Sequence, residues 1–299
     1  MSAPGKAARE VTGIGSTILE SVGQHRLLLG RQIGELHTPG ASRRWTHQKL
    51  ALLRAAGLAT GTAGPGSQLL WHLTERGADT LDGIPSRAET RRKVIAPEQA
   101  AGPLREHTIG VNEIGLAFVR AARERGDECG PFDWFHEVAH SLGPPPGRRM
   151  PEQLISDAVL TYQFAEQDGS TSIAYRFVEL DRANRSVADL ARRLGRYARF
   201  YRRRVAAEEP QAEAVPLWER LYPVFPTVLV VLDGRRPDRL EDRRRTLLAL
   251  CGQDPDLLDS PEVEVSVCLL DDLIERGPFA PICRTLADPD RDADWLGDS

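Results

Sequence analysis

Three acidic residues, Asp157, Glu179 and Asp181, have the chemical type and spacing of a divalent-metal site. Residues 154–164 and 172–181 are predicted to form two strands joined by a turn at residues 165–170. Side chains two residues apart point to the same face of a strand, so Glu179 and Asp181 share a face. If the connecting turn is short, Asp157 lies beside Glu179. Because Mg²⁺ and Mn²⁺ prefer oxygen ligands, these acids are candidate catalytic and metal-binding residues.

The segment that carries Glu179 differs at one position from that of an active nuclease. An Asp on one strand, then Glu-x-Lys on the next and a basic helix, is the layout of restriction-endonuclease-like nucleases. Here Asp181 replaces the lysine that assists the attacking water, and Arg182 points to the other face. We therefore favour a sheet retained for DNA binding without catalysis. The alternative is a Mg²⁺- or Mn²⁺-dependent nuclease or nickase using Asp157 and Glu179, and solvated acids at a strand end are the plain structural interpretation.

A second group of chemically capable residues is His136-Glu137-Val138-Ala139-His140, an HExxH string. On a helix, two histidines four residues apart can hold Zn²⁺ while the glutamate activates water. Pro146 stands where the extended motif has a third histidine, and neighbouring prolines leave room for only a short helix. Zinc hydrolysis with His136 and His140 as ligands is therefore a remote alternative, and structural or DNA-facing histidines are favoured.

Residues 186–205 form the segment best suited to bind a polyanion. At about 100° per residue this stretch is an amphipathic helix with Leu190, Leu194 and Tyr197 on its apolar side. The opposite side carries a row of arginines: Arg192, Arg196, Arg199 and Arg203. Arginine forks match pairs of phosphate oxygens, and residues 186–204 hold seven arginines and one acid. We predict that this row clamps DNA phosphates, provided that it faces solvent and not the acidic C-terminal stretch.

Residues 16–83 are predicted to form a winged helix-turn-helix domain. Its elements are three helices and a hairpin: 18–25, 27–36, 43–56, 58–62 and 68–74. The third helix has an apolar side with Leu50, Leu52 and Leu53. Its other side is polar and basic, with five candidate DNA-binding residues: Arg43, Arg44, His47, Gln48 and Arg54. Because such a helix fits the major groove, we predict that it binds DNA, and a domain used only for protein contacts is the alternative.

The rest of the chain is predicted to form a larger second domain. Helical stretches at 107–125 and 240–251 alternate with strands such as 227–232 and 263–270. This order predicts an α/β fold class (α+β overall), with an α/β sandwich of restriction-endonuclease-like topology after the winged helix. The predicted organisation is a disordered tail, the winged helix, a linker, the α/β domain and a frayed acidic tail: 1–15, 16–83, 84–105, 106–283 and 284–299.

The composition restricts the class of protein and its compartment. The 299 residues are 41% hydrophobic and 27% charged, with a net charge of −4, which is ordinary for a globular protein. The sequence has no apolar run near the ~18 residues that a membrane span needs and no secretory signal. The four cysteines lack CxxC spacing. We therefore expect a cytoplasmic protein with no membrane partner.

Several motifs carry a family resemblance. They are His107-Thr108-Ile109-Gly110-Val111-Asn112-Glu113, then Trp134 and Glu137, Ser156-Asp157-Ala158, Phe177-Val178-Glu179-Leu180-Asp181-Arg182, and Arg196-Tyr197 with Tyr201. With them, residues 15–205 resemble the replication-relaxation family of actinobacterial and other Gram-positive plasmids and mobile elements. Members usually read Gly-Thr where this chain has Ala183-Asn184. The resemblance implies DNA binding in plasmid replication or DNA relaxation, by a winged-helix region joined to a nuclease-like α/β region.

Together these patterns predict a protein whose partner is double-stranded DNA. It acts in plasmid replication, DNA relaxation or their regulation. DNA binding requires no cofactor, and Mg²⁺ or Mn²⁺ is needed only if the protein is a nuclease. The protein is a possible homodimer. A module that binds only other proteins is the alternative to DNA binding.

Overall fold

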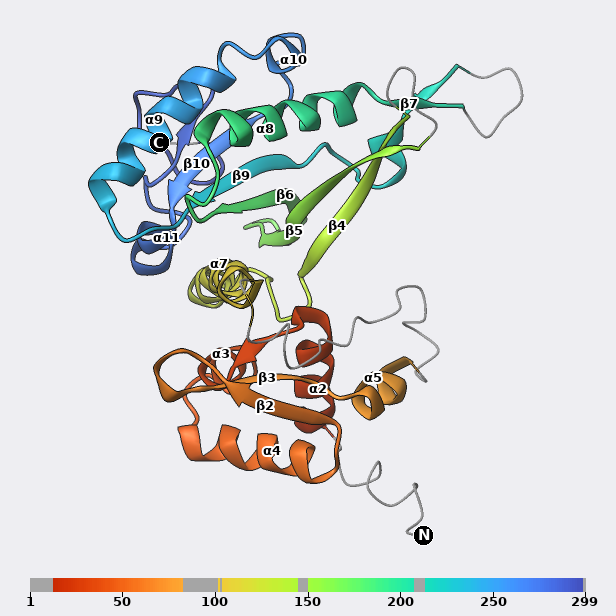
Figure 1. Ribbon diagram of the computed structural model, residues 1–299, viewed down its shortest axis with the longest axis vertical. Helices are drawn as coiled ribbons and strands as arrows, with labels where there is room; N and C mark the ends of the chain where they lie inside the picture. The colour runs from red at the N-terminus through yellow and green to blue at the C-terminus, as the bar shows by residue number, and fades with distance from the viewer. Residues whose placement is uncertain (1–12, 83–101, 103, 145–149, 207–212, 298–299) are drawn as a thin grey trace. The chain divides into compact units, whose positions relative to one another are not determined.

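The computed structural model describes residues 13–82, 102, 104–144, 150–206 and 213–297 (Figure 1). Most of the predicted linker and most of the predicted N-terminal tail lie outside these residues. The contacts divide the chain into an N-terminal unit, Met1–Val119 with Gly130–Phe132, and a C-terminal unit, Arg120–Cys129 with Asp133–Ser299. The chain is a mixed α/β protein, as the sequence predicts.

The N-terminal unit combines helices with a small sheet. The helices are α2 (Ile14–His25), α3 (Gly30–His37), α4 (Arg43–Ala55) and α5 (Glu75–Asp82). The sheet has the order β1-β3-β2, with β1 (Leu28–Leu29), β2 (Ala59–Ala63) and β3 (Leu69–Leu73). The three predicted helices and the hairpin are present. Strand β1 shortens the second predicted helix, because Leu28 pairs with Trp71 of β3, and α5 was not predicted.

Helix α4 packs with a different side from the one that its leucines predict. It buries Thr46, Leu50 and Leu53, whereas Leu52 is 56% exposed. The reason is the close approach of α3, since a Cβ atom added at Gly34 would lie 3.2 Å from the hydroxyl of Thr46. A small polar residue therefore occupies the centre of this contact, and Leu52 is turned to solvent.

Helix α7 (Leu104–Arg125) is fixed to the N-terminal unit through the end of the 107–113 motif. The side-chain amide of Asn112 donates to a backbone carbonyl in the loop after α2, at 2.8 Å. Glu113 accepts from Arg31 at 2.6 Å and from Gln32 at 2.5 Å. Asn112, Glu113 and Gln32 are all buried. Because unpaired buried polar groups are costly, this network specifies one arrangement of α7 against α3.

The C-terminal unit is built on a six-stranded mixed sheet of order β11-β10-β9-β6-β5-β4. Its strands are β4 (Trp134–Gly143), β5 (Glu152–Ala165), β6 (Thr171–Asp181), β9 (Thr227–Leu232), β10 (Val265–Leu269) and β11 (Arg284–Thr285). Strands β4, β5 and β6 form an antiparallel meander, and β6, β9 and β10 run parallel. A second small sheet pairs β7 (Arg204–Val205) with β8 (Val215–Pro216), just before a 3-10 turn at Leu217–Arg220.

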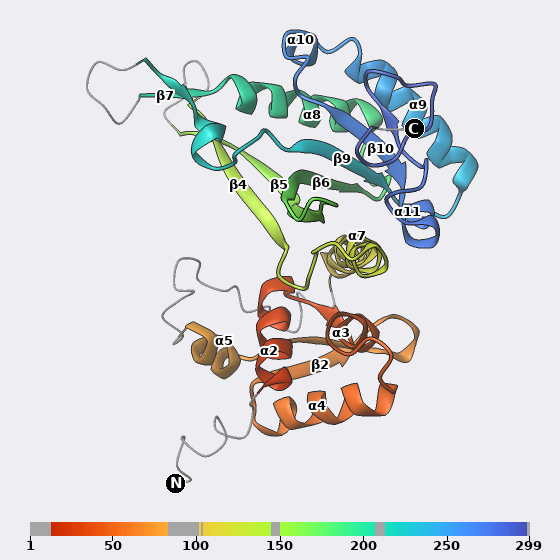
Figure 2. The same cartoon turned by 180° about the vertical axis from the view of Figure 1, so that it is seen from behind.

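Helices α8 (Val187–Arg202) and α9 (Pro237–Cys251) lie side by side on one face of this sheet (Figures 1 and 2). The hydroxyl of Ser186 accepts the backbone N–H of Asp189 and so caps the start of α8. The helix ends at Arg202, so Arg203 lies past its end, contrary to the predicted span. The short helices α10 (Pro255–Leu258) and α11 (Leu270–Arg276) follow.

The acidic segment 284–299, which the sequence predicts to be frayed, is folded through residue 297. Strand β11 pairs antiparallel with β10, and Trp295 has no exposed surface. The guanidinium of Arg176 lies 4.5 Å from the centroid of the Trp295 ring and donates to the Trp295 carbonyl. A single buried indole thus anchors a segment whose composition alone indicates disorder.

The structure also bears on the absence of an apolar run long enough to span a membrane and on the four cysteines. Within the described ranges, the helices are all too short or too polar to cross a bilayer. The four cysteines are buried free thiols.

Candidate functional site

The outer face of α4 carries the five residues predicted to contact DNA from this helix. Arg43, Arg44, His47, Gln48 and Arg54 are all exposed. Among the residues that the structure describes, no carboxylate pairs with any of these three arginines. Arg43 and Arg54 are three helical turns apart, which places them on one side of the helix at a separation of about 16 Å. Helix α4 therefore presents free cationic and amide groups over a length that suits a DNA groove.

Two cations of α4 lie over indole rings. The Nζ atom of Lys49 is 5.0 Å from the ring centroid of Trp45. The guanidinium carbon of Arg54 is 4.7 Å from the ring centroid of Trp71, which is 4% exposed. Such contacts restrict the side chains without using their N–H donors.

The carboxylates predicted to form one cluster are divided between two partners. Glu179 of β6 is buried, and the β5–β6 register places Asp157 beside it, as predicted. Asp181 lies at the end of β6 but forms an ion pair with Arg243 of α9. Within the described residues, no three His, Cys, Asp or Glu side chains are grouped to hold a metal ion. The three acids therefore do not form a single group in this structure, and their catalytic and metal-binding roles stay a prediction.

A guanidinium group lies between the two carboxylates that remain together. Arg193 Nη2 is 2.6 Å from Glu179 and 3.4 Å from Asp157. The hydroxyl of Tyr197 donates to Glu179 at 2.5 Å, and the backbone N–H of Leu180 donates to Asp157 at 2.8 Å. The oxygen atoms that a divalent cation would need are thus already bound by donors. As arranged, this pair does not fit Mg²⁺ or Mn²⁺.

Burial and neighbouring charges together set the pKa values of Glu179 and Arg193. Burial raises the pKa of Glu179 and the charge of Asp157 raises it further, while Arg193 and Tyr197 oppose both effects. Burial alone would lower the pKa of Arg193, but the charges of Glu179 and Asp157 outweigh it and raise that pKa. Arg193 therefore stays charged and links β5, β6 and α8 through one ion-pair network, in which Glu179 is buried and Asp157 and Arg193 are partly buried.

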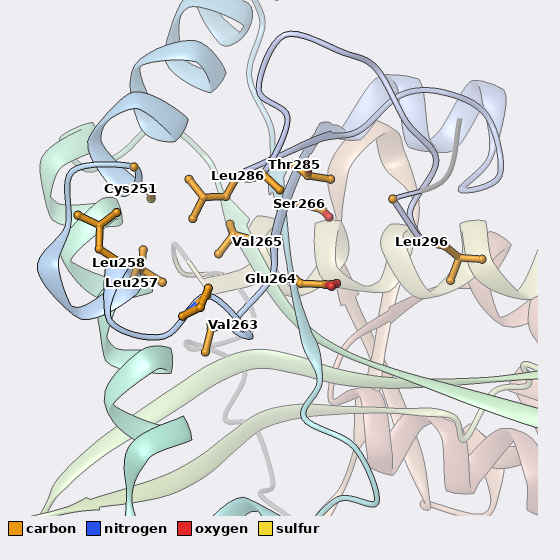
Figure 3. Close-up of a pocket in the computed structure, with 14 residues that line it drawn as sticks. Cys251, Leu257, Leu258, Val263, Glu264, Val265, Ser266, Thr285, Leu286 and Leu296 are labelled. Atoms are coloured by element: carbon orange, nitrogen blue, oxygen red, sulfur yellow. The ribbon is translucent and has the colours of Figure 1, made fainter.

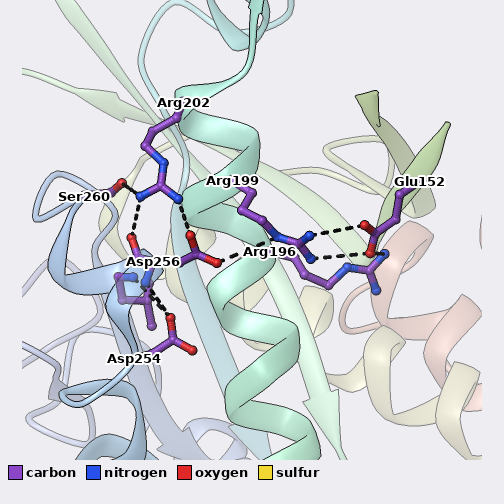
Figure 4. A network of polar contacts seen from close by, with 8 residues as sticks. Glu152, Arg196, Arg199, Arg202, Asp254, Asp256 and Ser260 are labelled. Carbon is purple, nitrogen blue, oxygen red and sulfur yellow. Dashed lines mark hydrogen bonds and ion pairs between the residues drawn. The ribbon is translucent and has the colours of Figure 1, made fainter. Parts of the chain in front are cut away.

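The arginine row of α8 does not present the free guanidinium groups that the helical pattern predicts. Glu152 at the start of β5 lies 3.1 Å from Arg196 and 3.2 Å from Arg199 (Figure 4). Asp256 of α10 pairs with Arg199 and Arg202. Asp256 belongs to the acidic C-terminal stretch, residues 254–299, which hold thirteen acids and three arginines, so part of the row is neutralised from within the chain. Arg196 and Arg199 are therefore paired and not free, and their contact with DNA phosphates stays a prediction.

The two ends of the row have different surroundings. The Arg192 side chain is 74% exposed and pairs with Asp189, one turn earlier in α8. Arg203 is half-buried, and its guanidinium uses the space beside Gly143, where an added Cβ atom would lie 2.8 Å from its central carbon. Arg203 therefore packs against β4, and Arg192 is the more accessible of the two.

The HExxH string lies on strand β4 and not on a helix. Residues four apart in a strand are separated by about 13 Å, so His136 and His140 are too far apart to bind one Zn²⁺ at about 2 Å each. His140 is buried, and its Nε2 atom lies 2.7 Å from the hydroxyl of Tyr222. Burial lowers the pKa of His140 to about 4. His140 is therefore a neutral core residue, and the zinc alternative does not fit this geometry.

A cavity of about 490 Å³ lies in the C-terminal unit beside the end of α9, α10 and strands β10 and β11 (Figure 3). Its walls are mainly apolar, with Leu257, Val265 and Leu286 among them, and Glu264 and Ser266 add polar atoms. The predicted site residues are not among the described residues that line it. It is therefore separate from both the α4 face and the carboxylate pair.

The sequence patterns do not single out Arg193 or Trp71. Arg193 falls at the border between the arginine side and the apolar side of α8, one turn before Tyr197, and that border position is the available signal. Trp71 pairs across the hairpin with Gly61. A tryptophan beside a glycine is recognisable only when the strand register is known.

Comparison with protein families matches the replication-relaxation description over residues 19–216, more than half of the 299-residue chain. No curated protein and no solved structure matches significantly. The matched range contains α4, the Asp157–Glu179 pair and α8, whereas α9, α10 and α11 lie beyond it. The chain therefore belongs to the replication-relaxation family.

Proposed function

We propose that this protein binds double-stranded DNA through the outer face of α4, in the replication or relaxation of plasmid or mobile-element DNA or in its regulation. The supporting observation is that the three exposed arginines of this face have no carboxylate partner among the described residues. The order α2, β1, α3, α4, β2, β3 supports the proposal of a winged helix-turn-helix, in which the third helix enters the major groove. We place this activity in the cytoplasm.

The positions along α4 suggest a division of roles. Residues near the start of a recognition helix contact base edges. Arg43 and Arg44 lie in the first turn of α4, and His47 and Gln48 lie one turn further. Arginine pairs with guanine and glutamine with adenine in the major groove. We assign base-edge contacts to these four residues and a backbone contact to Arg54.

We further propose that the protein acts without catalysis by its carboxylates. Arg193 bridges Asp157 and Glu179, and Asp181 is paired with Arg243. The alternative, a Mg²⁺- or Mn²⁺-dependent nuclease or nickase, requires Arg193 to leave both carboxylates before a cation enters.

A gel-shift titration of duplex DNA tests the binding proposal. The double variant R43A/R44A should lose about 100-fold in affinity at 0.1 M salt, because it removes two proposed base-edge contacts worth about 1–3 kcal/mol each. The matched control R236A/R245A removes two exposed arginines of the C-terminal unit, each paired with an aspartate nearby in sequence. Equal losses in both variants would show that net charge, and not the α4 face, governs binding.

A nicking assay tests the absence of catalysis. Supercoiled plasmid incubated with the protein and Mg²⁺ or Mn²⁺ should stay intact. Cleavage that D157A and E179A abolish would instead establish the nuclease alternative.

A further inference from the structure

We infer that Arg54 is a preset contact to the DNA sugar-phosphate backbone, held by Trp71 and given room by Gly61. This inference rests on the proposed function and names the role of one residue and the two residues that position it. Arg54 lies in the last turn of α4, at the far end of the helix from Arg43.

The platform beneath Arg54 is rigid. Trp71 is buried in β3, the central strand of the small sheet, and pairs with Leu28 on one side and Gly61 on the other. Its ring centroid lies 4.7 Å from the guanidinium carbon of Arg54. A ring that cannot move restricts the rotamers of the cation above it, which lowers the entropy lost when that cation binds.

Gly61 leaves the space that the guanidinium needs. Gly61 lies directly opposite Trp71, so a side chain there would project beside the indole ring. A Cβ atom at this position would lie 2.8 Å from Arg54 Nη2. Because the group in the way is the end of a flexible side chain, an alanine displaces the guanidinium without a backbone clash.

The N–H donors of Arg54 are available to a ligand. Arg54 is exposed and has no hydrogen-bond acceptor or carboxylate among the residues that the structure describes. Stacking on Trp71 uses the face of the guanidinium and leaves its fork of donors at the edge. A planar fork fits a phosphate group, and a position about 16 Å from Arg43 along the helix suits the backbone flanking a groove about 12 Å wide.

The test is the salt dependence of duplex-DNA affinity for the full-length wild type, R54A, G61A and R54A/G61A. We expect R54A to reduce the slope of log K against log salt by about one and the affinity by about tenfold at 0.1 M salt. G61A keeps the charge of Arg54 but displaces its guanidinium, so it should lower the affinity while retaining most of the slope, and the double variant should be no weaker than R54A. R54K keeps the charge and should restore most of the slope. The combination R44A/G61A is the matched control, and its losses should add.

Three outcomes overturn parts of this account separately. An unchanged slope in R54A would remove Arg54 from the backbone contacts. A further loss on adding G61A to R54A, with a lowered Tm, would show that Gly61 acts through Leu69, which also approaches its missing Cβ, and not through Arg54. Failure of the wild type to bind duplex DNA would refute the proposed function itself.

Discussion

Helices α4 and α8 both carry arginines on the side away from their apolar packing, but the surroundings of those arginines differ. The arginines of α4 extend into solvent without carboxylate partners among the described residues. In α8, Arg193 is bound by Asp157 and Glu179. In the arginine row, Arg196 and Arg199 are bound by Glu152, and Arg199 is also bound by Asp256.

The acids that pair with the α8 arginines come from distant parts of the sequence. Glu152 is 47 residues from Arg199, and Asp256 is 54 residues from Arg202. A count of charges within a helix cannot detect such partners, so the denser run of arginines on α8 is the less available one. Local charge density therefore indicates a polyanion site only when the acids that the fold brings near are also known.

The largest expected effect is a difference in the free energy of unfolding between variants of two adjacent arginines of α8. R193A leaves two carboxylates without their cation in a buried site and should lower the free energy of unfolding by about 3–5 kcal/mol. The neighbouring R192A removes an exposed side chain and should change it by less than about 0.5 kcal/mol. Urea-induced unfolding measures both. Similar values for the two variants would mean that Arg193 is not the centre of a buried network.

The next effect compares the two helices directly as DNA ligands. R43A/R44A should lower the affinity for duplex DNA about 100-fold at 0.1 M salt through lost base-edge contacts, whereas R196A/R199A should change the affinity less than about twofold and leave the slope of log K against log salt within about 0.3 of the wild type. The reason is that Arg196 and Arg199 share Glu152, and Arg199 also pairs with Asp256, so both guanidinium groups already have carboxylate partners. A flattened slope in the α8 variant would show that DNA displaces the acids, and the contrast between the helices would fail.

A pH titration examines the packing beneath α8. The ring of His140 lies 4.7 Å from that of Phe200, and burial lowers the pKa of His140 to about 4. In the unfolded chain His140 binds a proton near pH 6.5, whereas in the folded chain it stays neutral at that pH. Its contribution to the free energy of unfolding is therefore present above pH 6.5 and is lost as the pH falls. At pH 5 this contribution should be reduced by about 2 kcal/mol relative to pH 7. In urea-induced unfolding, H140F should lessen the fall in stability between pH 7 and pH 5 by about this amount, and the fall due to His25, whose pKa burial lowers to about 3, should remain.

Patterns with a local cause predicted much of the fold. The apolar run at 227–232 is strand β9, and the cap at Ser186 marks the start of α8. The β5–β6 hairpin places Asp157 beside Glu179 because the side-chain period of two holds along both strands. The exposure of the five polar residues on α4 also follows from helical periodicity.

Features with a long-range cause were not predictable in this way. His136 and His140 have a helical spacing, but pairing with β5 makes the segment a strand. Residues 284–297 are acidic, yet Trp295 fixes them to the sheet through Arg176. Arg193 resembles its neighbours until the fold places it between two carboxylates. In each case the decisive partner is far away in the sequence.

The smallest expected effect is a change in heparin retention when the acids that pair with the α8 arginines are removed. E152Q/D256N takes away the carboxylates that neutralise the outer arginines of α8. If those acids alone mask the row, retention on a heparin column should rise by more than in D238N/D242N, which removes two exposed acids of α9, each paired with a nearby arginine. The cost in stability should be small, because partly exposed ion pairs contribute about 0.2–1 kcal/mol each. Equal retention of the two variants would mean that packing, and not only the charge of Glu152 and Asp256, keeps the α8 arginines from a polyanion. Helix α4 would then be the stronger candidate for the polyanion-binding surface.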